Sequence, residues 1–357
     1  MEVKAVIPLI IAVEIGAVGI LNAVLFWFMP RLTRPDLYFA ITVAPGFRDD
    51  PEAKSILRRY RTELTLLSAL ALTAVVVGVS RLGAGFVPGA FLVQLAALFI
   101  AFYRARQRVL PHAVPPTTIR EAELHDRSRI IPGGWVVASG PFILLAACAV
   151  YMRIHPEGLS ARFTSVYLLS TAGTLAALTV ILYGISHWLR SVHAGGPEGA
   201  RELKFRGTVS VILVVTEYFI TLQASRVALA PLRHDLKPGS PGGIVISLLH
   251  LFLVLVAVVV LARLGQGGCR VLAANEISSG ISAVPVGDRT QDNYWKLGIL
   301  YFNRDDPAVV VEKRFGLGYT LNLARRATWV ILLLLLMGPL VPVLAHLSQF
   351  LTKIEGR

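Results

Sequence analysis

The chain has 357 residues, of which 55% are hydrophobic and 16% are charged, and its mean hydropathy is +0.64. This composition excludes a soluble globular protein, which carries fewer apolar and more charged residues at such a length. The net charge of +13 does not indicate nucleic-acid binding, because the Lys and Arg residues lie in the connections between apolar segments. The composition predicts an all-α integral membrane protein.

Apolar segments long enough to cross a membrane occur along the whole chain. The hydrocarbon core is about 30 Å thick, which requires roughly 20 apolar residues in a helix. The first segment has no basic leader and runs into the stop-transfer sequence LFWFMPRLTR, so we expect it to remain as a helix. About eight transmembrane helices are predicted, at residues 6–28, 63–80, 84–103, 135–154, 166–188, 208–230, 243–263 and 327–348.

Basic residues predict the orientation of these helices. The connections after the first, third, fifth and seventh segments hold 26 of the 35 Lys and Arg residues, counting Arg263 at the border. Short loops rich in Lys and Arg stay in the cytoplasm, so both termini are expected outside.

The first of these connections, residues 29–62, is strongly basic. Arg58, Arg59 and Arg61 come directly before the second predicted helix. We expect them to contact anionic lipid head groups, or else to act only as charges that set the topology. The run LYFAITV in the same connection has the composition of a short strand or of an interfacial segment.

A polar stretch at residues 292–323 precedes the last predicted helix. YWKLGILYF, AVVVEKRF and YTLNL have the composition of strands, and NRDDP and GLG that of turns. They predict a small cytoplasmic β meander, the cap, which needs the bundle or a partner to be stable. Its principal polar and aromatic residues are Trp295, Asn303, Asp305, Asp306, Arg314 and Asn322.

A metal site is the alternative for the acidic turn of this cap. Asn303, Asp305 and Asp306 offer oxygen ligands that suit Mg²⁺ or Ca²⁺. Their spacing lacks the glycine and the distal glutamate of a calcium-binding loop, which favours turn formation. No metal and no cofactor are therefore expected.

Three ionisable residues fall inside predicted membrane segments. Glu14 and Glu217 lie near the middle of the first and sixth segments, and His250 lies in the outer half of the seventh. Such residues are costly in a membrane and mark either a proton or cation site or a hydrogen bond between helices. His250 is placed at a depth that Glu217 reaches if these helices form a hairpin, and both alternatives stay open.

Several stretches resemble one family of bacterial multi-spanning proteins. The string YWKLGILYFNRDDPAVVVEKRFGLGYTLNLA is similar to a short C-terminal domain of unknown function in proteins related to the SdpI immunity and signalling family. PRLTRPDLYFAITVAPGFRDDPEAKSILRRYR and IPGGWVVASGPFILLAA are similar to other parts of that group. The resemblance implies a role in immunity, sensing or envelope stress in the bacterial inner membrane, without an established enzymatic activity.

The predicted organisation follows from these elements. It consists of a seven-helix region at 1–263, a cytoplasmic loop with the cap at 264–326, a last helix at 327–350 and a tag remnant, IEGR, at 354–357. The chain has no HExxH, GxSxG or Walker A motif, and no catalytic residue is assigned. We expect an inner-membrane sensor or immunity-type protein whose cap docks a protein partner. A proton- or cation-coupled transporter is the alternative, and lipids are expected partners in both.

Overall fold

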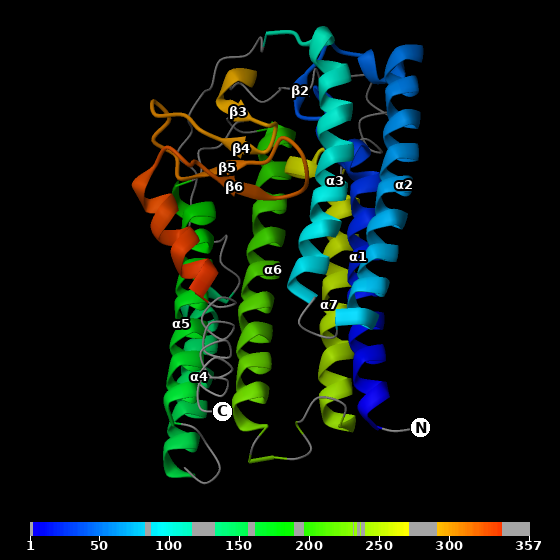
Figure 1. Ribbon diagram of the computed structural model, residues 1–357. Helices are drawn as coiled ribbons and strands as arrows, with labels where there is room; N and C mark the ends of the chain where they lie inside the picture. Colours follow the sequence, from blue (N-terminus) through cyan, green and yellow to red (C-terminus); the bar gives the residue numbers. More distant parts are fainter. Residues whose placement is uncertain are drawn as a thin grey trace. The chain divides into compact units, whose positions relative to one another are not determined.

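The computed structural model is mostly helical and falls into two compact units (Figure 1). Unit 1 comprises Met1–Arg120, Leu272–Phe302 and Glu312–Gly318, and unit 2 comprises Glu121–Val271, Asn303–Val311 and Tyr319–Arg357. The structure describes residues 3–82, 87–115, 133–155, 161–188, 196–230, 232–233, 236, 240–270 and 291–337. These units group residues by their contacts with one another. The predicted division into a seven-helix region, a cytoplasmic loop with the cap and a last helix follows the expected passage through a membrane, and it stays a prediction.

Within the described residues, every apolar segment of the prediction lies on a helix. Unit 1 contains α1 (Val3–Leu32), α2 (Pro51–Leu82) and α3 (Val87–Val109). Unit 2 contains α4 (Gly134–Ile154), α5 (Ala161–Tyr183), α6 (Gly196–Leu229) and α7 (Pro241–Leu264), and α5 continues into a π-helical turn at Gly184–Trp188. A further helix, Arg326–Met337, begins after the cap.

Two helices begin well before the predicted apolar segments. α2 begins at Pro51 and α6 at Gly196, where we expected 63 and 208. Proline is favoured in the first helical turn, and a polar segment continues a helix once its apolar part is anchored. Arg58, Arg59 and Arg61 therefore lie within α2, and the expectation that they precede the helix is wrong.

Five helical stretches are long and apolar enough to cross a membrane, judged by length and composition. They are Pro51–Gly78, Gly134–Ile154, Val166–Ser186, Arg201–Leu229 and Pro241–Gly268. The apolar stretches Val18–Leu32 and Arg326–Met337 are shorter within the described part of the chain. The chain is thus a membrane protein with eight described helices, of which five qualify as spans; eight spans remain a prediction.

The described strands form three pairs, and those at residues 292–323 form two separate hairpins, not one meander. β1 (Leu37–Tyr38) pairs with β2 (Ile41–Thr42), β3 (Trp295–Lys296) with β4 (Leu300–Tyr301), and β5 (Val310–Glu312) with β6 (Tyr319–Leu321). The predicted strands on either side of the GLG turn pair with each other, as expected. LYFAITV, expected as a short strand or an interfacial segment, and YWKLGILYF, expected as one strand, are each a hairpin instead. The reversal of YWKLGILYF occurs at Leu297 and Gly298, which both have positive φ angles of 55° and 81°.

The turn between β1 and β2 has an unusual sequence for its backbone conformation. Phe39 and Ala40 occupy it with φ angles of 47° and 62°, a combination that normally selects asparagine and glycine. Both side chains are fully buried. A bulky residue persists in this conformation only where the surrounding packing compensates for the strain.

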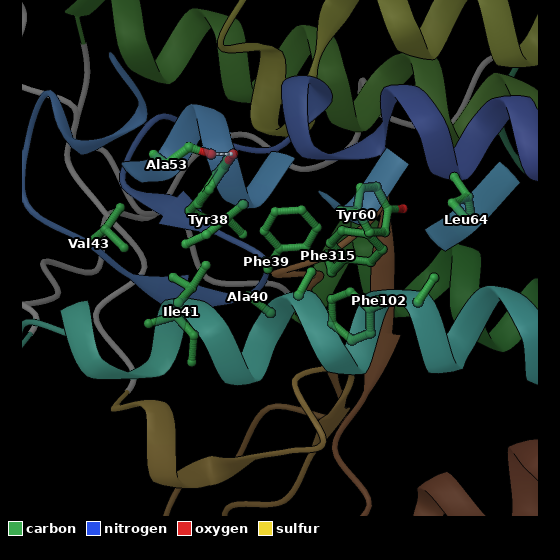
Figure 2. Packing of buried hydrophobic residues seen from close by; sticks show 14 of the residues in the cluster. Tyr38, Phe39, Ala40, Ile41, Val43, Ala53, Tyr60, Leu64, Phe102 and Phe315 are labelled. Atoms are coloured by element: carbon green, nitrogen blue, oxygen red, sulfur yellow. Dashed lines mark hydrogen bonds between the residues drawn. The ribbon is translucent and has the colours of Figure 1, made fainter. Parts of the chain in front are cut away.

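That compensation comes from the aromatic core of unit 1 (Figure 2). The Phe39 ring packs 4.8 Å from Tyr60 of α2 and 6.2 Å from Phe315, centroid to centroid. Phe315 in turn lies 4.1 Å from Phe102 of α3 and 5.8 Å from Phe26 of α1. Aromatic pairs in these arrangements add stability beyond the area that they bury. The core therefore joins the loop after α1, three helices and the Glu312–Gly318 segment of unit 1.

Unit 2 has its core along α4, α5 and α6. One buried cluster contains Ala138, Leu182 and Val214, one from each helix. A second, further along, repeats the pattern with Leu145, Leu175 and Ala224. Repeated contacts of this kind at one helix face hold the three helices together over their length.

Replacing Phe315 by alanine should lower the free energy of unfolding by about 3 to 5 kcal/mol, because the change opens a cavity among three other aromatic rings. Phe302→Ala is the matched control, since Phe302 is 37% exposed and should change it by under about 1 kcal/mol. Denaturant unfolding of the purified chain in detergent measures both. Equal losses in the two variants would show that this core is not what stabilises unit 1.

Candidate functional site

Glu217 is a fully buried carboxyl group in the middle of unit 2. The Thr179 hydroxyl of α5 lies 3.2 Å from Glu217 Oε1, and the Thr221 hydroxyl donates to the Glu217 backbone carbonyl at 3.0 Å. The second carboxyl oxygen, Oε2, is shielded from solvent and has no hydrogen-bond partner among the described residues. A buried oxygen with an unused bonding position is where a proton, a cation or a water molecule would bind.

The helix beside Glu217 is interrupted in its hydrogen bonding. Pro141 lies inside α4 and has no backbone N–H to donate to the carbonyl of Val137. The Tyr218 hydroxyl of α6 takes this place and donates to Val137 at 2.9 Å. A Cβ atom on Gly140 would lie 1.9 Å from that hydroxyl oxygen, so only glycine permits the approach. Tyr218 thereby fixes the part of α6 that carries Glu217 against α4.

His250 does not pair with Glu217. Its exposed ring packs edge-on against Phe219 at 4.3 Å, two residues along α6 from Glu217. Residues two apart on a helix point to different sides. His250 instead lines an apolar cavity of about 370 Å³ formed by α6 and α7, while Glu217 faces Thr179 of α5.

Glu14, the other carboxylate predicted in the membrane, lies in α1 of unit 1. Its side chain is outside the described residues. Whether it has a partner stays a prediction.

The cap residues of unit 1 surround a buried ion pair. Arg314 is fully buried and its guanidinium pairs with the carboxylate of Asp292. The same carboxylate accepts a hydrogen bond of 2.9 Å from the hydroxyl of Thr42 in β2, and Arg314 lies over the ring of Trp295 at 5.4 Å. A second contact between the same chain regions joins Arg34 to Glu312 at 3.0 Å. The predicted cap residues Trp295 and Arg314 are thus brought together, by a carboxylate that the sequence reasoning missed.

Arg106 of α3 supports two strained turns in the same unit. Its guanidinium donates to the carbonyl of Ala40 at 2.8 Å, and burial lowers the pKa of this group while the nearby Asp292 opposes that effect. Gly298, in the β3–β4 turn, lies so close that an added Cβ atom would be 3.0 Å from the Arg106 side chain. The arginine therefore binds the backbone of one turn and packs beneath the other.

The outer face of the β3–β4 hairpin is apolar. Trp295 and Tyr301 point inward and pack against each other at 4.9 Å. Leu297, Leu300 and Phe302 stay 47%, 41% and 37% exposed, beside the exposed Lys296. Neighbouring exposed apolar side chains of this kind are typical of a surface that meets another molecule.

The cap residues of unit 2 are organised by Asn322, which is fully buried. Its amide nitrogen lies 2.9 to 3.1 Å from the carbonyls of Asn303, Asp306 and Ala308, and its amide oxygen accepts from the Asn303 backbone N–H at 3.1 Å. Arg325 adds a bond of 2.7 Å to the Asp306 carbonyl. These contacts hold the NRDDP turn in place.

The acidic residues of this turn act on the backbone. Asn303 Oδ1 accepts from the Asp305 N–H at 2.9 Å, and Asp306 Oδ1 accepts from the Ala308 N–H at 3.0 Å. Such bonds are typical of turns that begin with Asn or Asp. No group of three or more His, Cys, Asp or Glu residues that could hold a metal ion occurs within the described ranges.

The three arginines expected at lipid head groups differ in their surroundings. Arg58 and Arg59 are exposed on α2. Arg61 is half-buried and lies over the ring of Trp27 at 5.1 Å. Only Arg61 has a defined environment.

Comparison with known proteins identifies one short region. Residues 304–329 match the model of a family of unknown function, DUF5808. These residues include Asp305 and Asp306 of the turn, and Asn322 and Arg325. No curated protein and no solved structure matches the chain.

The Asp292–Arg314 pair should respond unequally to loss of its two members. Asp292→Ala leaves the buried guanidinium uncompensated and should cost about 3 kcal/mol of unfolding free energy. Arg314→Met should cost less, about 1 kcal/mol, because the 21% exposed Asp292 can be hydrated. The double variant should regain part of the loss of Asp292→Ala. Thermal unfolding in detergent measures all three, and strictly additive losses would contradict a direct interaction.

Proposed function

We propose that this chain is a non-enzymatic bacterial inner-membrane protein of the sensor or immunity type, whose cap docks a protein partner on the cytoplasmic side. The resemblance of the C-terminal string to proteins related to SdpI supports the sensor or immunity class. The concentration of Lys and Arg in alternate connections supports the cytoplasmic position, with both termini outside. The apolar outer face of the β3–β4 hairpin carries the docking role.

The chemistry of this face favours one kind of partner. Leu297, Leu300 and Phe302 provide an apolar strip, and Lys296 places a positive charge beside it. A protein surface that is apolar at its centre and acidic at its edge would complement both features. The hairpin is held from behind by the Arg314 pair and by Arg106, so little conformational order is lost on binding.

Charge introduced on this face should abolish docking. We expect the double variant Leu300→Asp/Phe302→Asp to lose the partner recovered by cross-linking in native membranes, because two carboxylates would be buried at the interface. Leu110→Asp is the matched control, since Leu110 is a 46% exposed leucine elsewhere in unit 1. Thermal unfolding checks that each variant is folded.

The pattern of recovered proteins decides the proposal. Recovery of an acidic partner by wild type and by Leu110→Asp, but not by the double variant, supports it. An unchanged set of cross-linked proteins in the folded double variant would contradict it.

A second candidate function rests on Glu217. A fully buried carboxyl group with one unpartnered oxygen, beside the Thr179 hydroxyl, is suited to carry a proton or a small cation. We infer from this a proton- or cation-coupled transporter as the alternative. Sensors also bind protons in such positions, so transport itself must be measured.

Glu217→Gln should reduce proton or monovalent-cation flux in proteoliposomes at least tenfold, because the amide keeps the shape of the carboxyl group but cannot release a proton at ordinary pH. Thr216→Val serves as the control, as this neighbouring hydroxyl is exposed and bonds only within its helix. Absence of flux in the wild type under imposed gradients, or equal flux in Glu217→Gln, would exclude this function.

A further inference from the structure

We propose that the groove between α1 and α2 binds one anionic phospholipid, with an acyl chain against its apolar wall and the phosphate at Arg61 and Arg31. This inference is independent of the proposed function. It concerns unit 1 alone and rests on the groove, the two arginines and the residues between them.

The groove has the size and chemistry of a site for a lipid chain. It encloses about 420 Å³ and is lined only by residues of α1 and α2. Eight of its ten lining residues are apolar, and none is charged. Trp27 and Phe28 lie at the end nearest the loop after α1, and tryptophan is enriched where a helix meets the lipid head groups.

Arg61 lies one helical turn from the groove residues Leu64 and Thr65. Its Nε and Nη2 atoms are shielded from solvent and have no hydrogen-bond partner among the described residues. The guanidinium carbon lies 5.1 Å from the centre of the Trp27 ring, which screens the charge without accepting those hydrogen bonds. A phosphate oxygen is negatively charged and accepts hydrogen bonds from a guanidinium. It would therefore supply the acceptor that these two nitrogen atoms of Arg61 lack among the described residues.

A second unpaired arginine adds to this positive field. Arg31, at the end of α1, has no acidic partner among the described residues, and its charge repels that of Arg61. The phenol of Tyr38 reports the same field: burial raises its pKa to about 12, while Arg48, Arg61 and Arg31 act to lower it. Arg48 is hydrogen-bonded to the Thr33 hydroxyl and to nearby carbonyls, which leaves Arg61 and Arg31 for an anion.

The groove also contains one buried polar atom without a partner. Ser68 is 5% exposed and lines the groove, and its hydroxyl has no hydrogen bond within the described part of the chain. Seven residues separate it from Arg61, about 10 Å along the helix. The ester carbonyls of a glycerophospholipid lie between its phosphate and its acyl chains. With the phosphate at Arg61 and the chains in the groove, they lie on the Ser68 side and offer an acceptor to its hydroxyl.

The first measurement is lipid binding to the purified full chain in neutral detergent, followed by native mass spectrometry. Phosphatidylglycerol should bind about tenfold more tightly than phosphatidylcholine with the same chains, because two arginines face its net negative charge. Arg61→Gln should lower the affinity for phosphatidylglycerol about fivefold and leave that for phosphatidylcholine unchanged. Arg59→Gln is the matched control, since Arg59 is an exposed arginine of the same helix.

A second variant tests the groove separately from the charges. Ala69→Phe places a ring in the groove and should weaken the binding of both lipids at least fivefold, with Arg61 intact. Glycerol 3-phosphate, the head group without chains, should not displace phosphatidylglycerol at equal concentration. Thermal unfolding of each variant in detergent verifies that it is folded.

Three results would overturn the proposal. They are equal binding of the two lipids, equal losses in Arg59→Gln and Arg61→Gln, and displacement of phosphatidylglycerol by glycerol 3-phosphate alone. The last would mean that the arginines bind a phosphate to which the groove contributes nothing.

Discussion

Unit 1 depends on the burial of Phe39 and Phe315 against each other. The two rings come from opposite ends of the chain and lie 6.2 Å apart between α2 and α3 (Figure 2). Phe39 reaches this position only through a backbone conformation that disfavours a bulky residue. Aromatic burial outweighs that local cost, and it packs the Glu312–Gly318 segment of unit 1 on the loop after α1.

The polar contacts of unit 1 follow from its aromatic core. Once Phe315 is inserted, the neighbouring Arg314 is fully buried and requires a counter-charge. Asp292 supplies it, and Thr42 and Trp295 orient the pair from two further sides. The cap residues Trp295 and Arg314 are therefore part of the core of unit 1, whereas the outer face of the β3–β4 hairpin stays exposed.

In unit 2 the polar groups that require hydrogen bonds lie between helices. A proline in α4 releases one carbonyl, the Tyr218 hydroxyl satisfies it, and Gly140 leaves space for the contact. One turn of α6 thus carries a satisfied polar contact and, at Glu217, a carboxyl oxygen that is not satisfied. Elsewhere in this unit the side chain of Asn322 forms hydrogen bonds with backbone groups at both ends of the NRDDP turn. The contrast marks Glu217 as a buried carboxyl group with one unmet bonding position among the described residues.

Much of the architecture was predictable from local sequence. The described part of each apolar segment lies on a helix, because about 20 consecutive apolar residues have few other ways to satisfy their backbone hydrogen bonds. The turn role of Asn303 and Asp306 was also correct, since these side chains bond to backbone groups only two residues away. The starts of α2 and α6 were misplaced, because hydropathy marks the apolar part of a helix and not its polar extension.

By itself the sequence determined a membrane protein of apolar helices with a polar segment before the last one, because hydropathy and turn chemistry act over a few neighbouring residues. Only the tertiary structure decided which groups meet across long separations. Asp292 with Thr42, Phe39 with Phe315, and Arg61 over Trp27 are contacts of this kind. A buried charge or ring can be satisfied by many partners of the same type, and the packing of the whole unit selects one of them.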